Sequence, residues 1–486
     1  MDVPVVPDGR DPQDTQPELM RDIMLVIKLA VPNIISWLMG FITESINIFF
    51  IGRTGDDAEL AAIGLGNMMQ NCIALSVAFG FSNALDTFVS QASGAQQYDL
   101  CAVYLQRCRV LMSIQLIWMV PLLWFSEAIL VGMGQDVRVA THAGSYNRAT
   151  VFGLFFIFQF QAVQKYLQNQ GHVKAPAVIA GACSVLHIAW CSIFIVHFRL
   201  GNYGAGLANV VTWMLEFALG TGYLWYVAPE LKQTRRSVLF IRRQALAFQG
   251  LRQYLNLGIP TVLALCSEWW FWEICALIVG YLGPTPLAAH VATMNVVAIC
   301  FMVVLGIGAS AAQLVGAALG AGRPKQAWRY CWVCVALNLV CWSVMALCLV
   351  FGAKPIAFAY TKEPAVSDVV EVLVRIFAVI GFLDSTQNIM GGVLRGVGRQ
   401  RMAAIMYCIS YYVVMTPLSV LLGFPLDLGI YGIWYSMGIG TGLMCVGFSV
   451  ILCKMDWQLL AVEASDRLLQ DSADALALVD PCSCTP

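Results

Sequence analysis

Charged side chains are scarce in this sequence of 486 residues. Asp, Glu, Lys and Arg together make up 12% of it, whereas soluble domains carry about 25%. Hydrophobic residues make up 59%, and the mean hydropathy is +0.72. The formal net charge of −1 gives no reason to expect binding to nucleic acid. The composition therefore predicts a protein whose solvent is a lipid bilayer.

The motifs that carry enzyme chemistry are also missing. The sequence has no phosphate-binding loop and no zinc-protease, kinase or hydrolase signature. We therefore expect neither an enzyme nor a bound cofactor. The 17 cysteines are scattered, mostly inside apolar runs, without the spacing of metal ligands, which favours small buried hydrophobic residues over a metal site.

A secretory signal peptide is not apparent. The first 22 residues are acidic and proline-rich, without a basic stretch followed by an apolar one. We expect residues 1–22 to form a disordered cytoplasmic arm, and residues 456–486 to form a cytoplasmic tail. Within that tail, "WQLLAVEASDRLLQ" is suited to an amphipathic helix at the membrane surface.

Long apolar runs, in contrast, are abundant. A helix that crosses the hydrocarbon core needs about 20 mostly apolar residues. Twelve segments qualify: 26–52, 58–87, 108–134, 143–166, 176–197, 204–228, 255–282, 287–316, 327–353, 366–394, 402–424 and 430–453. Unsatisfied backbone is not tolerated in lipid, and these runs are too long for barrel strands. The sequence predicts an all-α integral membrane protein with twelve transmembrane helices.

Lys and Arg are distributed unevenly among the loops. If the N-terminus is cytoplasmic, the cytoplasmic loops hold more than twice as many of them as the loops on the other side. This bias predicts that both termini are cytoplasmic. The segment 231–253 alone holds six basic residues. The position of this segment on the cytoplasmic side explains its basic residues more simply than a contact with anionic lipid does.

The two halves of the chain resemble each other at an offset of about 227 residues. Four pairs of segments match in order: "LAVPNIISWLMGFITESINIFFIG" (29–52) with "LGIPTVLALCSEWWFWEICALIVG" (257–280), "VSQASGAQ" (89–96) with "VGAALGAG" (315–322), "LQNQGHVK" (167–174) with "LRGVGRQR" (394–401), and "LGNYGAG" (200–206) with "LGIYGIW" (428–434). Six spans per half is an even number, so both halves enter the membrane in the same direction, as a parallel repeat.

This repeat predicts the domain organisation. We expect an N-lobe of six helices over 23–230, a basic cytoplasmic inter-lobe loop over 231–253, and a C-lobe of six helices over 254–455. Two similar bundles with a cleft between them are the geometry of alternating access. That geometry indicates a transporter.

Six acidic residues fall inside or near the ends of the predicted spans: Glu44, Asp86, Glu216, Glu268, Glu273 and Asp384. A charge at a helix centre costs about 3 kcal/mol, so such residues usually face a cavity or a partner. No Lys or Arg lies near the centre of a span to pair with them. Desolvation favours the protonated form of a carboxyl group, and a proton and a cation then compete for it. That competition is the chemistry of proton–cation exchange.

The stretch "CSEWWFWEI" (266–274) holds two of these acids among aromatic residues. Glu268 and Glu273 are about 140° apart around a helix, so we expect at most one to point straight into the main cavity. Glu268 shares its face with Trp272, an arrangement that suits an organic cation. Trp269 is a further candidate for the cavity wall.

The remaining candidates have different neighbours. Asp384 lies beside Gln387 and Asn388 in "GFLDSTQNIMGGVLRG", and all three are candidates for the site. Two N-terminal residues, Glu44 and Asn83, are further cavity-lining candidates.

A structural role is favoured for Glu216, whereas for Asp86 a functional and a structural role are equally open. Glu216 has no aromatic or polar companions in "WMLEFALG", and Asp86 lies near a cytoplasmic end, where a carboxylate caps a helix or forms an ion pair.

Several of these stretches resemble the multidrug and toxic compound extrusion (MATE) transporters of the eukaryotic branch. They are "CSEWWFWEI", "FLDSTQNIMGGVLRGVGRQ", "YYVVMTPLSVLL", "SNALDTFVSQASGAQ" and "KYLQNQG", and the resemblance runs from about residue 20 to 455. It implies two six-helix lobes around an outward-facing cleft, and antiport of organic compounds, usually against protons. The acids that carry coupling in that family correspond to Glu268, Glu273 and Asp384.

The expected partners are therefore a small organic substrate, protons and the lipid bilayer, with the protein as a monomer. The acidic cavity favours cations over the anions, such as citrate or flavonoids, that some members of the family move. Sodium coupling is an alternative to protons. A lipid flippase is a weaker one, because it would need basic residues inside the cleft. The sequence does not distinguish the plasma membrane from the vacuolar membrane.

Overall fold

The computed structural model describes residues 18–226 and 241–476. Most of the predicted N-terminal arm and part of the predicted inter-lobe loop lie outside these residues. The rest of the arm, residues 18–22, is not disordered but forms the start of a long helix, and its Glu18 and Asp22 both form ion pairs with Arg329. The part of the loop beyond residue 247 is also helical and begins the seventh spanning helix.

Within the described residues the chain is helical and has no strand. The helices of the first half, here called the N-lobe, are α1 (Glu18–Gly52), α2 (Asp57–Gln70), α3 (Ser76–Asn83), α4 (Leu85–Gly94), α5 (Tyr98–Trp124), α6 (Ser126–Gly132), α7 (Val137–Thr150), α8 (Leu154–Asn169), α9 (Lys174–Cys191) and α10 (Gly201–Tyr226). Those of the C-lobe are α12 (Phe248–Gly280), α13 (Pro284–Gly320), α14 (Pro324–Tyr360), α15 (Pro364–Val397), α16 (Gln400–Cys408), α17 (Thr416–Gly423) and α18 (Gly429–Lys454). A further helix, α19 (Trp457–Leu476), follows.

These helices correspond to the twelve predicted spans. Short π-helical segments, Asn71–Leu75, Ser192–His197 and Ile409–Met415, occur inside the second, fifth and eleventh. Nine segments of the described chain are long and apolar enough by themselves to cross a membrane. The other three spans are α7 with α8, α10, and α15. The predicted architecture of two six-helix lobes is confirmed.

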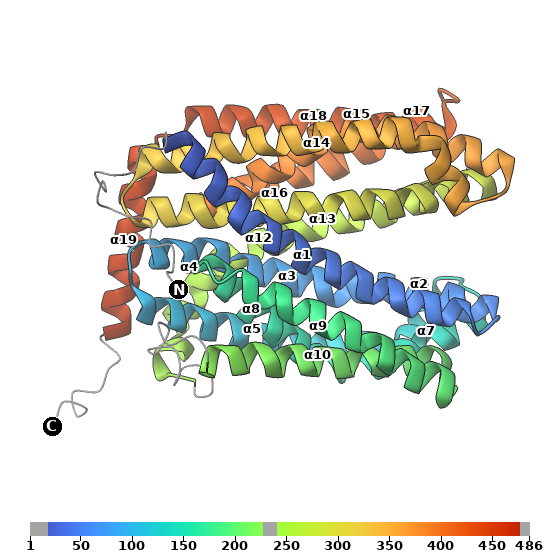
Figure 1. Ribbon diagram of the computed structural model, residues 1–486, viewed down its shortest axis with the longest axis horizontal. Coiled ribbons are helices and arrows are strands. Elements are labelled where there is room, and N and C mark those ends of the chain that lie inside the picture. Colours follow the sequence, from blue (N-terminus) through green and yellow to red (C-terminus); the bar gives the residue numbers. More distant parts are fainter. Residues whose placement is uncertain (1–17, 227–240, 477–486) are drawn as a thin grey trace.

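Figure 1 shows the N-lobe helices, in blue to green, and the C-lobe helices, in yellow to red, as two layers that run along the same direction. Helix α1 begins beside the C-lobe and crosses into the N-lobe. It packs against α13 of the C-lobe and against α9 of the N-lobe. In the same way, the first helix of the C-lobe, α12, packs against α3 of the N-lobe. Each lobe therefore contacts the other through its own first helix.

Equivalent positions of the sequence repeat make equivalent contacts between the lobes. A Cβ atom at Gly80 of α3 would lie 2.5 Å from the Cα atom of Val262 in α12. Its equivalent, Gly306 of α13, meets the backbone of Ile34 in α1 just as closely. Because Gly80 and Gly306, and Ile34 and Val262, occupy matching positions in the two halves, the lobes are related by an approximate twofold axis, as the parallel repeat predicts.

At the α19 end the two lobes meet along a seam of small residues on α4 and α13. A Cβ atom at Gly94 would overlap the backbone of Ala317, and one at Gly320 would overlap that of Gln91. These two contacts are again equivalent in the repeat. On the C-lobe side, the Gln91 amide donates a hydrogen bond to the Gly396 carbonyl (3.0 Å). At these two glycines the seam leaves no room for a side chain.

Helix α19 lies across this end of the molecule (Figure 1) and contacts both lobes. Its Glu463 accepts from Arg399 of the C-lobe at 2.8 Å, and its Arg467 donates to Gln91 of the N-lobe at 2.9 Å. Asp471 accepts from the hydroxyl of Tyr104 in α5. The amphipathic helix predicted in the tail is present, and it connects the lobes where their seam is tightest.

Candidate functional site

A cavity of about 370 Å³ lies between the lobes. Its walls come from α1, α2, α8 and α10 on one side and from α12 and α13 on the other. Four glutamates line it, Glu44, Glu216, Glu268 and Glu273, and the lining includes no Lys, Arg or His from the described residues. The volume suits one small organic molecule, and the charge favours a cation.

Both acids of α12 line this cavity, contrary to the expectation that at most one would. The side chains of Glu268, Trp269, Trp272 and Glu273 all belong to the lining. With 100° per residue they cover an arc of about 140° of the helix surface. The cavity wraps around that arc, so two acids at its edges can both reach it. Trp270 falls outside the arc, and its indole donates to the Cys72 carbonyl at 3.1 Å.

Aromatic side chains form much of the wall near Glu268. The ring of Phe79 contacts Trp37 and Trp269 edge to face, with centroids 6.0 and 5.8 Å apart. All three rings belong to the lining. Indole faces attract organic cations through their quadrupole. This wall therefore offers apolar area and a cation-attracting surface beside a carboxylate.

The N-lobe wall is a network of polar groups that bond to one another. Asn209 donates to the hydroxyl of Tyr146 (2.9 Å), which donates to Asn67 (2.7 Å). Asn47 donates to Asn209 from behind (2.7 Å). Glu44 lies in the same wall with an exposed side chain and no hydrogen bond or ion pair within the described chain. The network holds the wall in place and leaves this carboxylate available.

Glu216 is the acid that sequence reasoning missed, because a structural role was expected for it. Its side chain lines the cavity from α10. The overlooked signal lies one turn earlier, where Thr212 and Trp213 share its helix face and also line the cavity.

Inside the C-lobe, the predicted coupling acid Asp384 lies on α15 together with Gln387 and Asn388. The amide of Asn388 donates to Glu268 Oε1 at 3.2 Å. One turn earlier, Asp384 is 7% exposed and accepts from Gln387 at 3.3 Å. Neither Asp384 nor Gln387 belongs to the lining of the cavities described here, so the expectation that Gln387 faces the cavity does not hold. Its amide is occupied inside the lobe instead. Asn388 lies on the same face of α15 as Asp384 and donates a hydrogen bond to Glu268 of α12.

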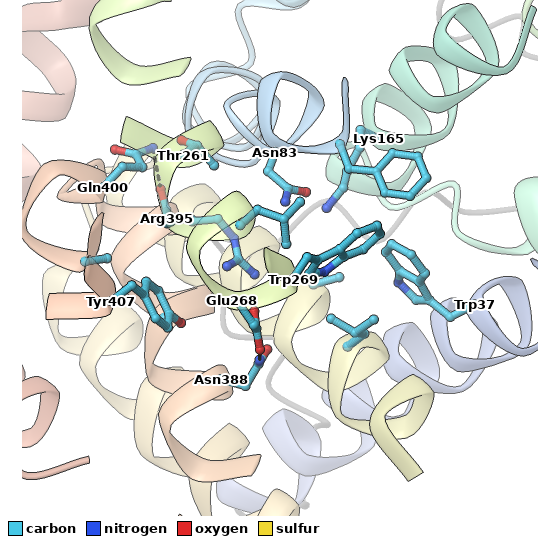
Figure 2. A pocket seen from close by; sticks show the side chains of 17 residues that line it. Trp37, Asn83, Lys165, Thr261, Glu268, Trp269, Asn388, Arg395, Gln400 and Tyr407 are labelled. Atoms are coloured by element: carbon cyan, nitrogen blue, oxygen red, sulfur yellow. Dashed lines mark hydrogen bonds between the residues drawn. The ribbon is translucent and has the colours of Figure 1, made fainter. Parts of the chain in front are cut away.

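A smaller cavity, of about 50 Å³, lies on the α19 side of Glu268. Figure 2 shows that the guanidinium of Arg395 points toward Glu268, while Lys165 and Asn83 lie on the opposite wall. Asn83, predicted to line the main cavity, faces this smaller one. Glu268 lines both cavities, which places it between the main site and the seam.

Asp86 forms ion pairs, one of the roles that its place near a span end allows, and its basic partners also lie near span ends rather than at span centres. Its carboxylate accepts from Lys165 at 3.1 and 3.2 Å and from Asn169 at 3.0 Å, and it lies 3.5 Å from Arg395 of the other lobe. Lys165 and Arg395 lie near span ends, 79 and 309 residues away in sequence, and only the fold brings them to Asp86. The ion pair with Arg395 adds a charged contact between lobes next to the seam.

Replacing Asp86 with Asn should destabilise the protein strongly. Lys165 is 7% exposed, and a buried cation that loses its partner costs about 3–5 kcal/mol. The measurement is the melting temperature in detergent, which should fall by several degrees. The matched control is Asp99→Asn, since Asp99 is 65% exposed at its ion pair with Arg242. Equal melting temperatures for the two variants would contradict a structural role for the Asp86 pair.

Comparison with known proteins is consistent with this geometry. The sequence model of the MatE family matches residues 29–193 and 260–421. Protein DETOXIFICATION 36 of Arabidopsis thaliana is 30% identical over 92% of this chain and 88% of its own length. Multidrug and toxin extrusion protein 2 of Mus musculus is 28% identical over 93% and 78%. The crystal structure of the eukaryotic MATE transporter AtDTX14 superimposes with a TM-score of 0.87 at 24% identity, covering 93% of this chain and 100% of that one.

Proposed function

The chain belongs to the MatE family of multidrug and toxin extrusion transporters, and from this premise we propose that it is an antiporter that exports organic cations in exchange for protons. The observation that carries the proposal is the main cavity: four glutamates and several indoles line it without a single basic side chain from the described residues. An organic cation finds both charge and apolar area there. An organic anion would meet four carboxylates.

The position of the seam supports an outward-facing state, with the α19 end in the cytoplasm. The small-residue contacts of α4 with α13 and the ion pair of Asp86 with Arg395 close that end. Toward the opposite end, Glu44 on α1 is exposed. Export by alternating access then requires that the seam opens and the opposite ends close.

Glu268 is the residue at which proton and substrate compete. As a carboxylate it holds a cation in the main cavity; as an acid it holds none. Asn388 donates to it and also lies one turn from Asp384, so protonation of either acid changes the charge on the same face of α15. Protons from the far side would release the substrate, and the proton-loaded protein would return. A ligand shifts the two states only by its differential affinity for them.

The lipid flippase alternative would need free basic groups for a phosphate headgroup. Lys165 and Arg395 are the basic residues of the smaller cavity, and both already lie beside Asp86. Their charge therefore serves the contact between lobes. This arrangement favours a cation exporter.

The direct test is transport by the wild-type protein in proteoliposomes. We expect a proton gradient opposed to the substrate flux to drive exchange of a fluorescent organic cation, and a sodium gradient of equal size to have no effect. The measurement is the initial rate under each gradient, with protein-free liposomes as the control. A rate that follows sodium would overturn proton coupling, and exchange of anions alone would overturn the substrate class.

A further inference from the structure

Glu216 has a feature that proton–cation exchange at Glu268 does not use. Only 9% of its surface is exposed, yet it forms no hydrogen bond or ion pair with any other part of the described chain. A buried carboxylate without a partner carries a large desolvation cost. Its side chain faces the main cavity. A cation in the cavity relieves that cost, as protonation does when no cation is bound.

The polar residues on the two preceding turns of α10 already have partners of their own. The Thr212 hydroxyl donates to the Ala208 carbonyl (2.9 Å) and bonds to the ring of His187 (2.8 Å). Asn209 bonds to Asn47 and Tyr146. Thr212 and Asn209 are thus bonded to other groups of the N-lobe, while Glu216 and Glu44 are left without a bond in the described chain.

The cavity also has acids on two opposite sides. Glu216 and Glu44 belong to the N-lobe, whereas Glu268 and Glu273 belong to α12. The lining also includes apolar surface, to which Phe160 of α8 contributes. A ligand with one positive charge neutralises only one of these two acidic sides.

We propose that Glu216, together with Glu44, forms a second cation-binding site, and that the preferred substrates are amphipathic dications with two ammonium groups joined by an apolar linker. One ammonium lies at Glu268 and Glu273, and the other lies at Glu216 and Glu44. This inference rests on the proposed export of organic cations and adds the number and placement of charges on the substrate.

The test compares bis(trimethylammonium)alkanes of increasing linker length with alkyltrimethylammonium ions of the same chain length. Each compound competes with a fluorescent monocation for exchange in proteoliposomes. Titration calorimetry on the detergent-solubilised full chain measures its binding directly. For wild type, we expect one linker length at which the dication binds about tenfold more tightly than its monocation, which corresponds to about 1.4 kcal/mol.

In Glu216→Gln, the ratio of dication to monocation affinity should fall to near one. Glu216→Asp, which retains the charge on a shorter side chain, should restore a preference at a longer linker. The matched control is Glu363→Gln, because Glu363 is exposed and its side chain does not cap α15; its ratio should equal that of wild type.

The results separate this inference from the proposed function. If the dication has no advantage at any length, or if Glu216→Gln keeps the wild-type ratio, the second site is ruled out even when proton-driven exchange is present. If calorimetry shows dication binding that depends on Glu216 but no gradient drives exchange, the second site stands and proton antiport falls.

Discussion

Glu268→Gln is expected to reduce proton-driven exchange of an organic cation by at least about tenfold, and to background if Glu268 is the only acid at which proton and substrate compete. The glutamine keeps the size of the side chain and its ability to accept from Asn388, which donates to Glu268 at 3.2 Å. What it loses is the titratable charge between the two cavities. The measurement is the initial exchange rate under a fixed pH gradient, together with the melting temperature.

Asp384→Asn tests the second part of the same assignment. Asp384 lies outside the main cavity and accepts from Gln387 inside the C-lobe. Its replacement should therefore alter the pH dependence of exchange more than the affinity for substrate. Full pH-driven transport in Asp384→Asn would show that coupling does not involve this acid. Glu273→Gln is the comparison within α12, and it should weaken substrate affinity while leaving a response to the pH gradient.

Placing a larger side chain in the seam should have the second large effect on transport. In Gly320→Leu the new side chain would overlap the backbone of Gln91, and overpacking of this kind costs about 1–3 kcal/mol. A difference of 1.4 kcal/mol changes the ratio of two states about tenfold. The state with the seam closed should therefore no longer be the more populated of the two. The measurement is the initial rate of exchange together with the melting temperature, and both should fall well below the wild-type values.

Gly64→Leu provides the control for this variant. Gly64 lies within α2, and a Cβ atom there would meet nothing within 4 Å. The control should melt and transport like wild type. The repeat adds a second test, because Gly94→Leu meets the backbone of Ala317 in the equivalent way. If Gly320→Leu also melts and transports like wild type, the seam does not control which end is open.

The architecture could be predicted from the sequence because its causes are local or periodic. Each span can be recognised from about 20 apolar residues, and the repeat can be recognised from similar segments at a nearly constant offset. The acids of α12 could be identified because a carboxylate among four aromatic residues is costly in lipid. In these cases the physical signal lies within one segment of the chain.

What the sequence could not show depends on how helices face each other. The partners of Asp86, Lys165 and Arg395, come from distant helices, so a search for basic residues within one span misses them. Glu216 looked structural because Thr212 and Trp213, one turn earlier, were not counted as its companions, and its other cavity neighbours come from other helices. The arc of α12 that the cavity covers depends on how α1 and α13 approach it. The orientation of helices and the distances between them belong to the tertiary structure, and the pattern within one segment does not determine them.

The symmetry of the seam has a consequence for how this gene can change. Gly94 contacts Ala317 and Gly320 contacts Gln91, and in each contact one partner comes from each copy of the ancestral half. The atoms that each glycine meets belong to backbone, so a smaller side chain in the other copy cannot make room for a larger residue. The two halves are free to diverge on their lipid-facing surfaces, but both copies are expected to keep glycine at this position. An alignment of relatives should therefore show glycine at both positions, rather than compensating pairs of larger and smaller residues.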